Sequence, residues 1–126
     1  WSSTSRGWNV AEVVSDFGNN NGLILGGEIP DWRGIAETAL TCQTFIDDQQ
    51  VGNGGATTLP GGLRTAYAFA LSRSAKRGRP LKAGDLIATG NATGIHDITA
   101  GQRARISFNG YGDINCVAKP AGPEAA

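Results

Sequence analysis

The sequence lacks methionine altogether, and its 126 residues include one histidine and two cysteines. A translated chain begins with methionine, whose removal normally requires a small second residue. A chain that begins with Trp1 is therefore expected to be a processed or partial piece of a longer protein. The two cysteines, Cys42 and Cys116, are too far apart for the CxxC spacing typical of a structural metal site, so the sequence predicts no such site.

Long apolar runs and an excess of charge of one sign are also missing. No run approaches the ~18 residues of a membrane span, and nothing resembles a signal peptide. Eleven basic and eleven acidic residues cancel to zero, which argues against a dedicated polyanion binder. Both cysteines lie in apolar stretches, which favours buried free thiols, with a disulfide as the alternative. We therefore expect a cytoplasmic protein that binds neither a membrane nor nucleic acid.

Glycine is abundant instead, with 19 residues against an expectation of about 7%. Together with five prolines it indicates many turns and short elements, as in an α+β, mostly β domain. We expect one partial domain over residues 1–119 and a frayed tail over 120–126. Apolar periodicity and turn residues predict two helices packed on the sheet, and several strands. The helices are expected at 10–17 and 63–77, strands at 23–25 and 85–89, a loop at 52–62, a hairpin with its tip at Asp47-Asp48, and a hairpin pairing 104–108 with 114–117.

Basic residues crowd the end of the second predicted helix. Cations there interact favourably with the helix dipole. A nucleic-acid patch is the alternative, although no aromatic residues interleave with the cations as in a single-strand platform. The basic residues are Arg73, Lys76, Arg77, Arg79 and Lys82.

The candidates for catalytic chemistry are few. His96 is followed by Asp97 and is either an oriented general base or an ordinary loop histidine. The GxSxG motif of a serine nucleophile is absent, and the glycine-rich loops lack the strand and helix context of nucleotide-binding motifs. The sequence therefore assigns no catalytic residue.

The loop TGNATG combines two hydroxyls, one amide and two glycines after an apolar run. Glycines allow backbone N–H groups to approach an anion, and the side chains can orient a carboxylate or a keto oxygen. A purely structural turn is the alternative. We interpret the loop as the substrate-binding segment and expect it to border the largest pocket. Its candidate residues are Thr89, Gly90, Asn91, Thr93 and Gly94.

The run RGRPLKAGDLIATGNATGIHDITAGQRARISFNGYGDINC resembles the C-terminal end of the fumarylacetoacetate hydrolase superfamily. It is most similar to the branch of 2-keto-4-pentenoate hydratases and 4-oxalocrotonate decarboxylases. The shared features are L-x-x-G-D, the T-G-x-x-x-G loop and F-x-G-x-G. The resemblance implies a mixed β-roll or sandwich with two helices. It also implies an oligomeric, Mg²⁺- or Mn²⁺-dependent lyase that acts on 2-keto or 2-hydroxydienoate acids in aromatic catabolism.

The sequence departs from this family where the resemblance would place metal ligands. Family members hold the ion with a Glu-x-Glu pair and a further Glu, and hard oxygen ligands suit such metals. Trp1 stands at the position of that further Glu and Thr4 at that of a common Asp, and no lysine occurs between Arg6 and Arg33. We therefore expect this chain alone to bind neither metal tightly. It is either the C-terminal part of a lyase, completed by an N-terminal partner chain or a homo-oligomer, or a catalytically inactive binding or assembly subunit.

Overall fold

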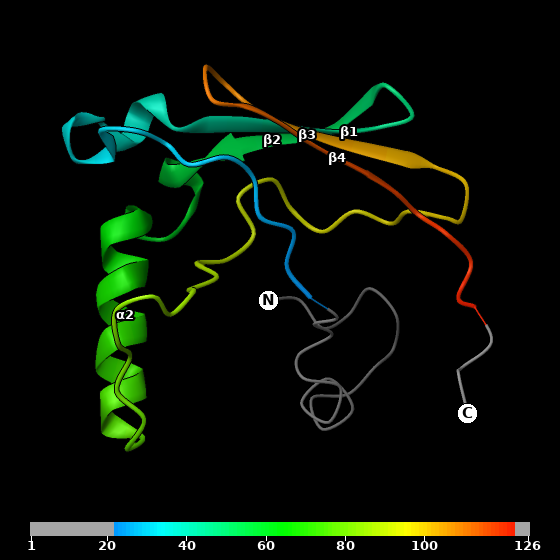
Figure 1. Cartoon of the computed structure of the whole chain (residues 1–126). Coiled ribbons are helices and arrows are strands. Elements are labelled where there is room, and N and C mark those ends of the chain that lie inside the picture. The colour runs from blue at the N-terminus through cyan, green and yellow to red at the C-terminus, as the bar shows by residue number, and fades with distance from the viewer. Residues whose placement is uncertain (1–21, 123–126) are drawn as a thin grey trace.

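The computed structural model describes residues 22–122, which form an antiparallel sheet, one α-helix and short 3₁₀ turns (Figure 1). The four strands lie in the order β2-β1-β3-β4. This arrangement confirms the predicted α+β, mostly β class, and every described strand pair is antiparallel. The predicted helix at 10–17 lies outside the described residues. The elements are η2 (Trp32–Gly34), η3 (Glu37–Ala39), β1 (Thr41–Ile46), β2 (Gln49–Gly55), η4 (Ala56–Thr58), α2 (Gly62–Lys76), β3 (Arg103–Phe108) and β4 (Gly112–Val117).

The first hairpin joins β1 and β2 through Asp47 and Asp48, as the sequence predicts. Both aspartates have left-handed backbone angles, with φ of 48° and 62°. Aspartate tolerates this conformation better than most residues, which suits it to a tight hairpin turn. The Asp47 carboxylate also accepts hydrogen bonds from the Arg103 N–H at 3.0 Å and from Gln102 Nε2 at 3.1 Å. The turn is thereby tied to the start of β3.

The strand β2 runs through the segment GNGG, for which the sequence predicts a loop. Its pairing with β1 continues to Gly54 opposite Cys42 and Gly55 opposite Thr41. The expectation of a loop is wrong because it rests on the low strand propensity of glycine, and tertiary context overrides that propensity. Here the context is a second segment of chain that packs on these glycines, as described below.

The second predicted hairpin is confirmed. Ala104 pairs with Cys116 and Ile106 with Ile114, and the chain turns through Asn109 and Gly110, whose φ is 81°. Strand β3 also pairs with β1, which places it in the interior of the sheet. Alternation along β3 therefore sends its apolar residues to one face and its arginines to the other.

The two faces of the sheet differ in chemistry. On the inner face, Cys42 and Thr44 of β1 are each 7% exposed. On the outer face, the Arg105 guanidinium lies 4.0 Å from the centre of the Phe45 ring and 3.7 Å from an oxygen of Asp113. Because residues paired across strands share a face, the inner face continues through β3 as apolar surface.

Two short predicted strands are wrong. Residues 23–25 and 85–89 pair with no strand in the described part of the chain. Leu23, Ile24, Leu25 and Leu86 are more than half exposed. A short apolar run has no periodicity that separates a buried strand from an extended segment, so the prediction had little support. None of the helices in residues 22–122 is long and apolar enough to cross a membrane.

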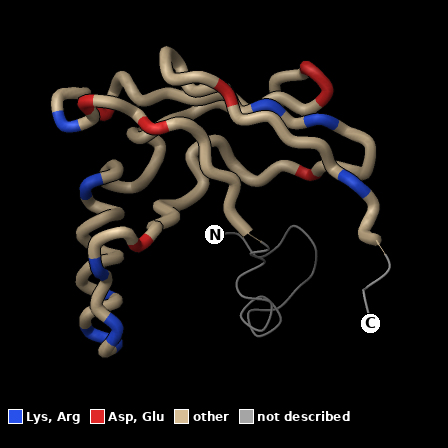
Figure 2. The backbone as a smooth tube through the Cα atoms, in the orientation of Figure 1, with Lys and Arg blue, Asp and Glu red and all other residues tan. Residues whose placement is uncertain are grey.

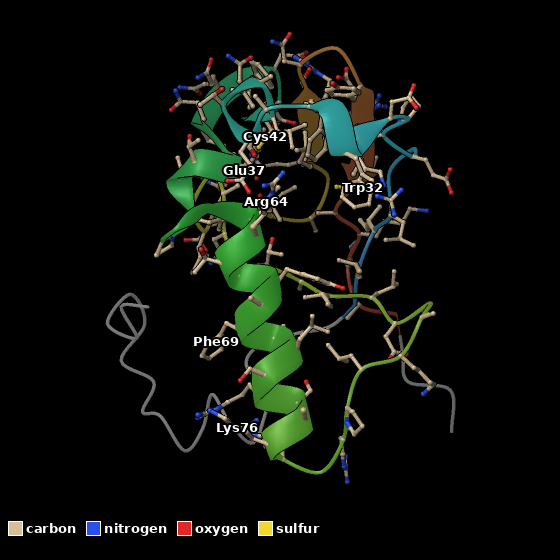
Figure 3. The ribbon with its side chains drawn as sticks, turned by 90° about the vertical axis from the view of Figure 1, so that its left-hand side faces the viewer. Trp32, Glu37, Cys42, Arg64, Phe69 and Lys76 are labelled. Carbon is tan, nitrogen blue, oxygen red and sulfur yellow. The ribbon has the colours of Figure 1, made fainter. Side chains whose placement is uncertain are left out.

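The helix α2 matches its predicted range to within one residue at each end, but it does not pack on the sheet as predicted. It projects away from the sheet, as Figure 1 shows, and Figure 3 shows Phe69 pointing outward from it. Tyr67 is 52% and Phe69 64% exposed. Gly61 precedes the helix and Gly62 is its first residue; they have φ of 73° and 79°, and this turn starts the helix away from the sheet. Periodicity alone could not predict that direction.

Positive charge gathers at the far end of α2 (Figure 2). Arg73 and Lys76 lie in its last turn, and Gly78 follows with φ of 75°. Arg73 also lies 6.0 Å from the centre of the Phe69 ring. This position suits cations at the carboxyl end of a helix dipole.

The beginning of α2 is capped from a distant part of the chain. Glu37, in η3, places Oε1 3.1 Å from the Arg64 N–H and accepts a hydrogen bond from it. In Figure 3 the Glu37 and Arg64 labels lie together at this end of the helix. The first N–H groups of a helix have no partner within the helix, and a carboxylate there also faces the positive end of its dipole. Glu37 therefore couples η3 to α2.

We predict that Glu37→Ala lowers the free energy of unfolding by about 1 kcal/mol, the usual effect of losing a helix cap. Chemical denaturation of the variant measures this difference. Glu28→Ala is the matched control, because Glu28 is an exposed glutamate outside the helix cap, and its removal should change stability by less than about 0.5 kcal/mol. Equal losses in the two variants would contradict the capping role.

Candidate ligand pocket

A cavity of about 350 Å³ lies between the inner face of the sheet and the TGNATG loop. Its size is at the lower end of the range for small-molecule sites. Strands β1 and β3 supply one wall, the loop supplies another, and η4 with the first turn of α2 supplies a third. The lining residues are Ile29, Leu40, Thr41, Cys42, Thr44, Gly55, Ala56, Leu59, Leu63, Thr89, Gly90, Ala92, Thr93, Ile106, Phe108 and Tyr111.

Hydrogen bonds of three threonine hydroxyls hold the loop in place. Thr93 Oγ1 lies 2.8 Å from Thr44 Oγ1 in the middle of β1, so the two hydroxyls are hydrogen-bonded. Thr58 Oγ1 donates to the Ala92 carbonyl at 2.8 Å and also lies 2.7 Å from the Gly55 carbonyl. The loop is thus attached both to the interior of the sheet and to the corner between β2 and α2.

The loop can reach these partners because glycines line the inner face of β2. A Cβ atom at Gly52 would collide with the Thr93 carbonyl oxygen and lie 2.7 Å from His96 Cε1. A Cβ atom at Gly54 would collide with the Ala92 carbonyl oxygen. Gly52 and Gly54 pair with Thr44 and Cys42 and therefore share their face. The absence of side chains on β2 makes room for the backbone of the loop.

The structure brings together only part of the predicted site. Thr89, Gly90 and Thr93 line the cavity, whereas Asn91 and Gly94 are exposed and are not among its lining residues. The cavity is also not the largest, because a hollow of about 600 Å³ lies beside Phe45, Arg103 and Arg105. The prediction of the largest pocket is therefore wrong. That prediction rested on the polar residues of the loop, and the sequence gives no indication of the cavities that the sheet forms elsewhere.

Sequence reasoning missed the residues that complete the pocket from the other side. Cys42, Thr44 and Phe108 come from strands, and Leu59 and Leu63 come from the corner that precedes and starts α2. The alternation along β1 was the available indication, since it places Cys42 and Thr44 on one face. Nothing in the sequence showed that the loop would cover that face.

The cavity is electrically neutral. None of its described lining residues carries a charged side chain. Burial raises the pKa of the Cys42 thiol above its usual value, so the thiol stays protonated and is a poor nucleophile. Both cysteines are free; Cys42 is buried as predicted, whereas Cys116 is only half-buried. The described walls of this cavity can enclose and orient a ligand, but they include no histidine and no charged side chain.

His96 lies behind the loop rather than in the cavity. Its ring packs against Gly52, and its Nε2 is buried with no hydrogen-bond partner among residues 22–122. Because it does not line the cavity, the structure gives no geometry for the general base considered from the sequence. Its packing instead supports the loop against β2.

The described residues do not form a metal-binding cluster. Among residues 22–122, no three His, Cys, Asp or Glu side chains are grouped so that they could hold an ion. The donors present in this range therefore do not fit a Mg²⁺ or Mn²⁺ centre of the kind the resemblance implies.

Comparison with known proteins points to hydratases as the similar class. No family model matches the sequence. The chain is 26% identical over 117 residues to 2-keto-4-pentenoate hydratase 1 of Dechloromonas aromatica (strain RCB), which covers 91% of this chain and 44% of the hydratase. It is also 26% identical over 117 residues to 2-keto-4-pentenoate hydratase 2 of the same organism, covering 91% of this chain and 45% of that hydratase. The chain thus spans less than half the length of these hydratases, and the similarity is distant.

We predict that Gly54→Ala displaces the loop, because the new methyl group would occupy the space of the Ala92 carbonyl. Overpacking of this kind costs about 1–3 kcal/mol of stability. Urea denaturation measures the loss, and amide shifts of residues 92–96 report the displacement. Gly27→Ala is the control, since a Cβ atom there meets no atom within 4 Å. If Gly54→Ala matches the control in stability and loop shifts, β2 does not position the loop.

Proposed function

We propose that this chain is part of a hydratase-type lyase that acts on 2-keto or 2-hydroxydienoate acids, and that it contributes the substrate-orienting cavity. The observation that supports the proposal is the similarity to two 2-keto-4-pentenoate hydratases, which extends over 91% of the chain. The resemblance of the TGNATG loop and the strands that follow it to this branch agrees with that similarity.

Hydration of 2-keto-4-pentenoate adds water across its terminal double bond. A proton is added to C5 and a hydroxyl group to C4, which gives 4-hydroxy-2-oxopentanoate. The reaction needs a positioned substrate and groups that transfer protons. The cavity supplies the first requirement through its shape and its threonine hydroxyls. The proton-transfer groups must come from outside its described walls, because those walls hold no histidine and no charged side chain.

The second candidate is a catalytically inactive binding or assembly subunit. The observation that favours it is the departure at Trp1 and Thr4, where the resemblance would place acidic residues. Such a subunit would keep the cavity and bind the same class of acid, but it would not hydrate it. The two candidates therefore differ in turnover and agree in ligand binding.

A chimera separates the two candidates. This chain replaces the matching segment of 2-keto-4-pentenoate hydratase 1, and hydration of 2-hydroxypenta-2,4-dienoate is followed by the loss of its ultraviolet absorbance. We expect turnover, reduced from that of the parent because the new interface is imperfect. The parent hydratase is the control for the assay, and thermal melting confirms that the chimera is folded. A folded chimera that binds the acid without hydrating it would favour the inactive subunit.

We further predict that this chain alone binds Mg²⁺ and Mn²⁺ weakly, with a dissociation constant above about 1 mM. Divalent ions in such enzymes act as Lewis acids, and in our proposal the ligands lie outside residues 22–122. Isothermal titration calorimetry of the isolated chain measures the affinity. A tight site with one ion per chain would contradict the prediction, and Glu28→Gln and Asp97→Asn would then locate it.

A further inference from the structure

The polarity of the cavity limits which end of an acid it can hold. Its described walls carry no positive charge, and its buried residues include Cys42, Thr44, Ala56 and Leu59. A carboxylate moved from water into such surroundings without a cationic partner is strongly disfavoured. The cavity thus suits an uncharged group, and the carboxylate of a bound acid belongs outside it.

The hydrogen-bonded pair of Thr44 and Thr93 adds a polar position to this uncharged space, whose other hydroxyl-bearing lining residues are Thr41, Thr89 and Tyr111. In the bond between Thr44 Oγ1 and Thr93 Oγ1 one hydroxyl donates and the other accepts, which uses one of the two hydroxyl hydrogens. The accepting hydroxyl keeps its own hydrogen, and both threonines line the cavity. The pair can therefore donate one hydrogen bond to a neutral oxygen, such as that of an alcohol, and can accept one in return.

We propose that the cavity binds the end of the substrate remote from the carboxylate, namely a short uncharged tail that is either apolar or carries a neutral oxygen. The site thereby selects monocarboxylic over dicarboxylic 2-oxo acids. Thr44 and Thr93 recognise the tail oxygen, and Leu59 and Leu63 contact its carbon atoms. This inference rests on the proposed function only for the identity of the ligand as a 2-oxo acid. It replaces our expectation that the loop orients the carboxylate.

The test is an NMR titration, in which three 2-oxo acids are added in turn to the isotopically labelled chain and its chemical shifts are monitored. The acids are 2-oxopentanoate with an apolar tail, 4-hydroxy-2-oxopentanoate with a hydroxylated tail, and 2-oxoglutarate with a charged tail. We expect the first two to shift resonances of Leu59, Leu63 and Thr93, and 2-oxoglutarate to bind there at least tenfold more weakly. Equal affinity for 2-oxoglutarate, or no shift at these residues with any acid, would overturn the proposal. So would shifts confined to Arg103 and Arg105 on the outer face.

Two variants test the residues assigned to the tail. Thr93→Val keeps the shape of the side chain and removes its hydroxyl, so it should weaken binding of 4-hydroxy-2-oxopentanoate about fivefold to tenfold and change that of 2-oxopentanoate less than twofold. Thr57→Val is the matched control, because Thr57 is exposed and does not line the cavity. Equal weakening of both acids by Thr93→Val, in a protein with unchanged melting temperature, would contradict the hydroxyl's role.

Leu63→Lys supplies the missing charge. Leu63 is half-buried in the first turn of α2 and lines the cavity, so a lysine there can reach it without burying its whole length. We expect this variant to bind 2-oxoglutarate at least fivefold more tightly than the unaltered chain and to bind 2-oxopentanoate more weakly. Unchanged preference in a folded variant would overturn the assignment of the tail to this wall. Each of these experiments measures ligand affinity and none measures turnover. A folded chimera without turnover would therefore refute the proposed hydratase function and leave the proposed ligand selectivity intact.

Discussion

The close approach of the TGNATG loop to the glycines of β2 is the constraint on which the pocket depends. Side chains at Gly52 and Gly54 would occupy the positions of the Thr93 and Ala92 carbonyl oxygens. Without this approach the hydroxyls of Thr93 and Thr44 could not meet at 2.8 Å, and the loop would not cover the inner face of β1. Glycine is unfavourable in the interior of a strand, yet Gly52 and Gly54 create the space in which the loop is fixed.

The sheet separates charge from apolar surface, and this separation gives the cavity its neutrality. Successive residues of β3 point to opposite faces, so Arg105 interacts with Phe45 and Asp113 on the outer face while Ile106 lines the cavity. A one-residue shift of register would bring arginines to the inner face. The pairing of Thr44 with Ile106 therefore fixes both the fold and the kind of ligand that the inner face tolerates.

Sequence reasoning succeeded where local chemistry decides the structure. The Asp47-Asp48 turn, the Asn109-Gly110 hairpin and the length of α2 all follow from turn propensity and periodicity within a few residues. It failed where distant contacts decide, as for the direction of α2 and the pairing of 52–55. The same division applies to the site. The loop residues were found from their composition, but Cys42, Thr44 and Leu63 join them only through tertiary packing that no local pattern encodes.

The described part of the chain buries little, and this bears on where chemistry can occur. Its buried apolar residues are Cys42, Ala56 and Leu59, while Phe69 is 64% and Ile95 74% exposed. The hydratases to which the chain is similar are more than twice as long. A neutral cavity beside a small core can orient a ligand, but catalysis of hydration also needs groups that exchange protons. In the proposed enzyme this chain therefore positions the tail of the substrate, and groups outside the described walls of the cavity act on its reacting carbons.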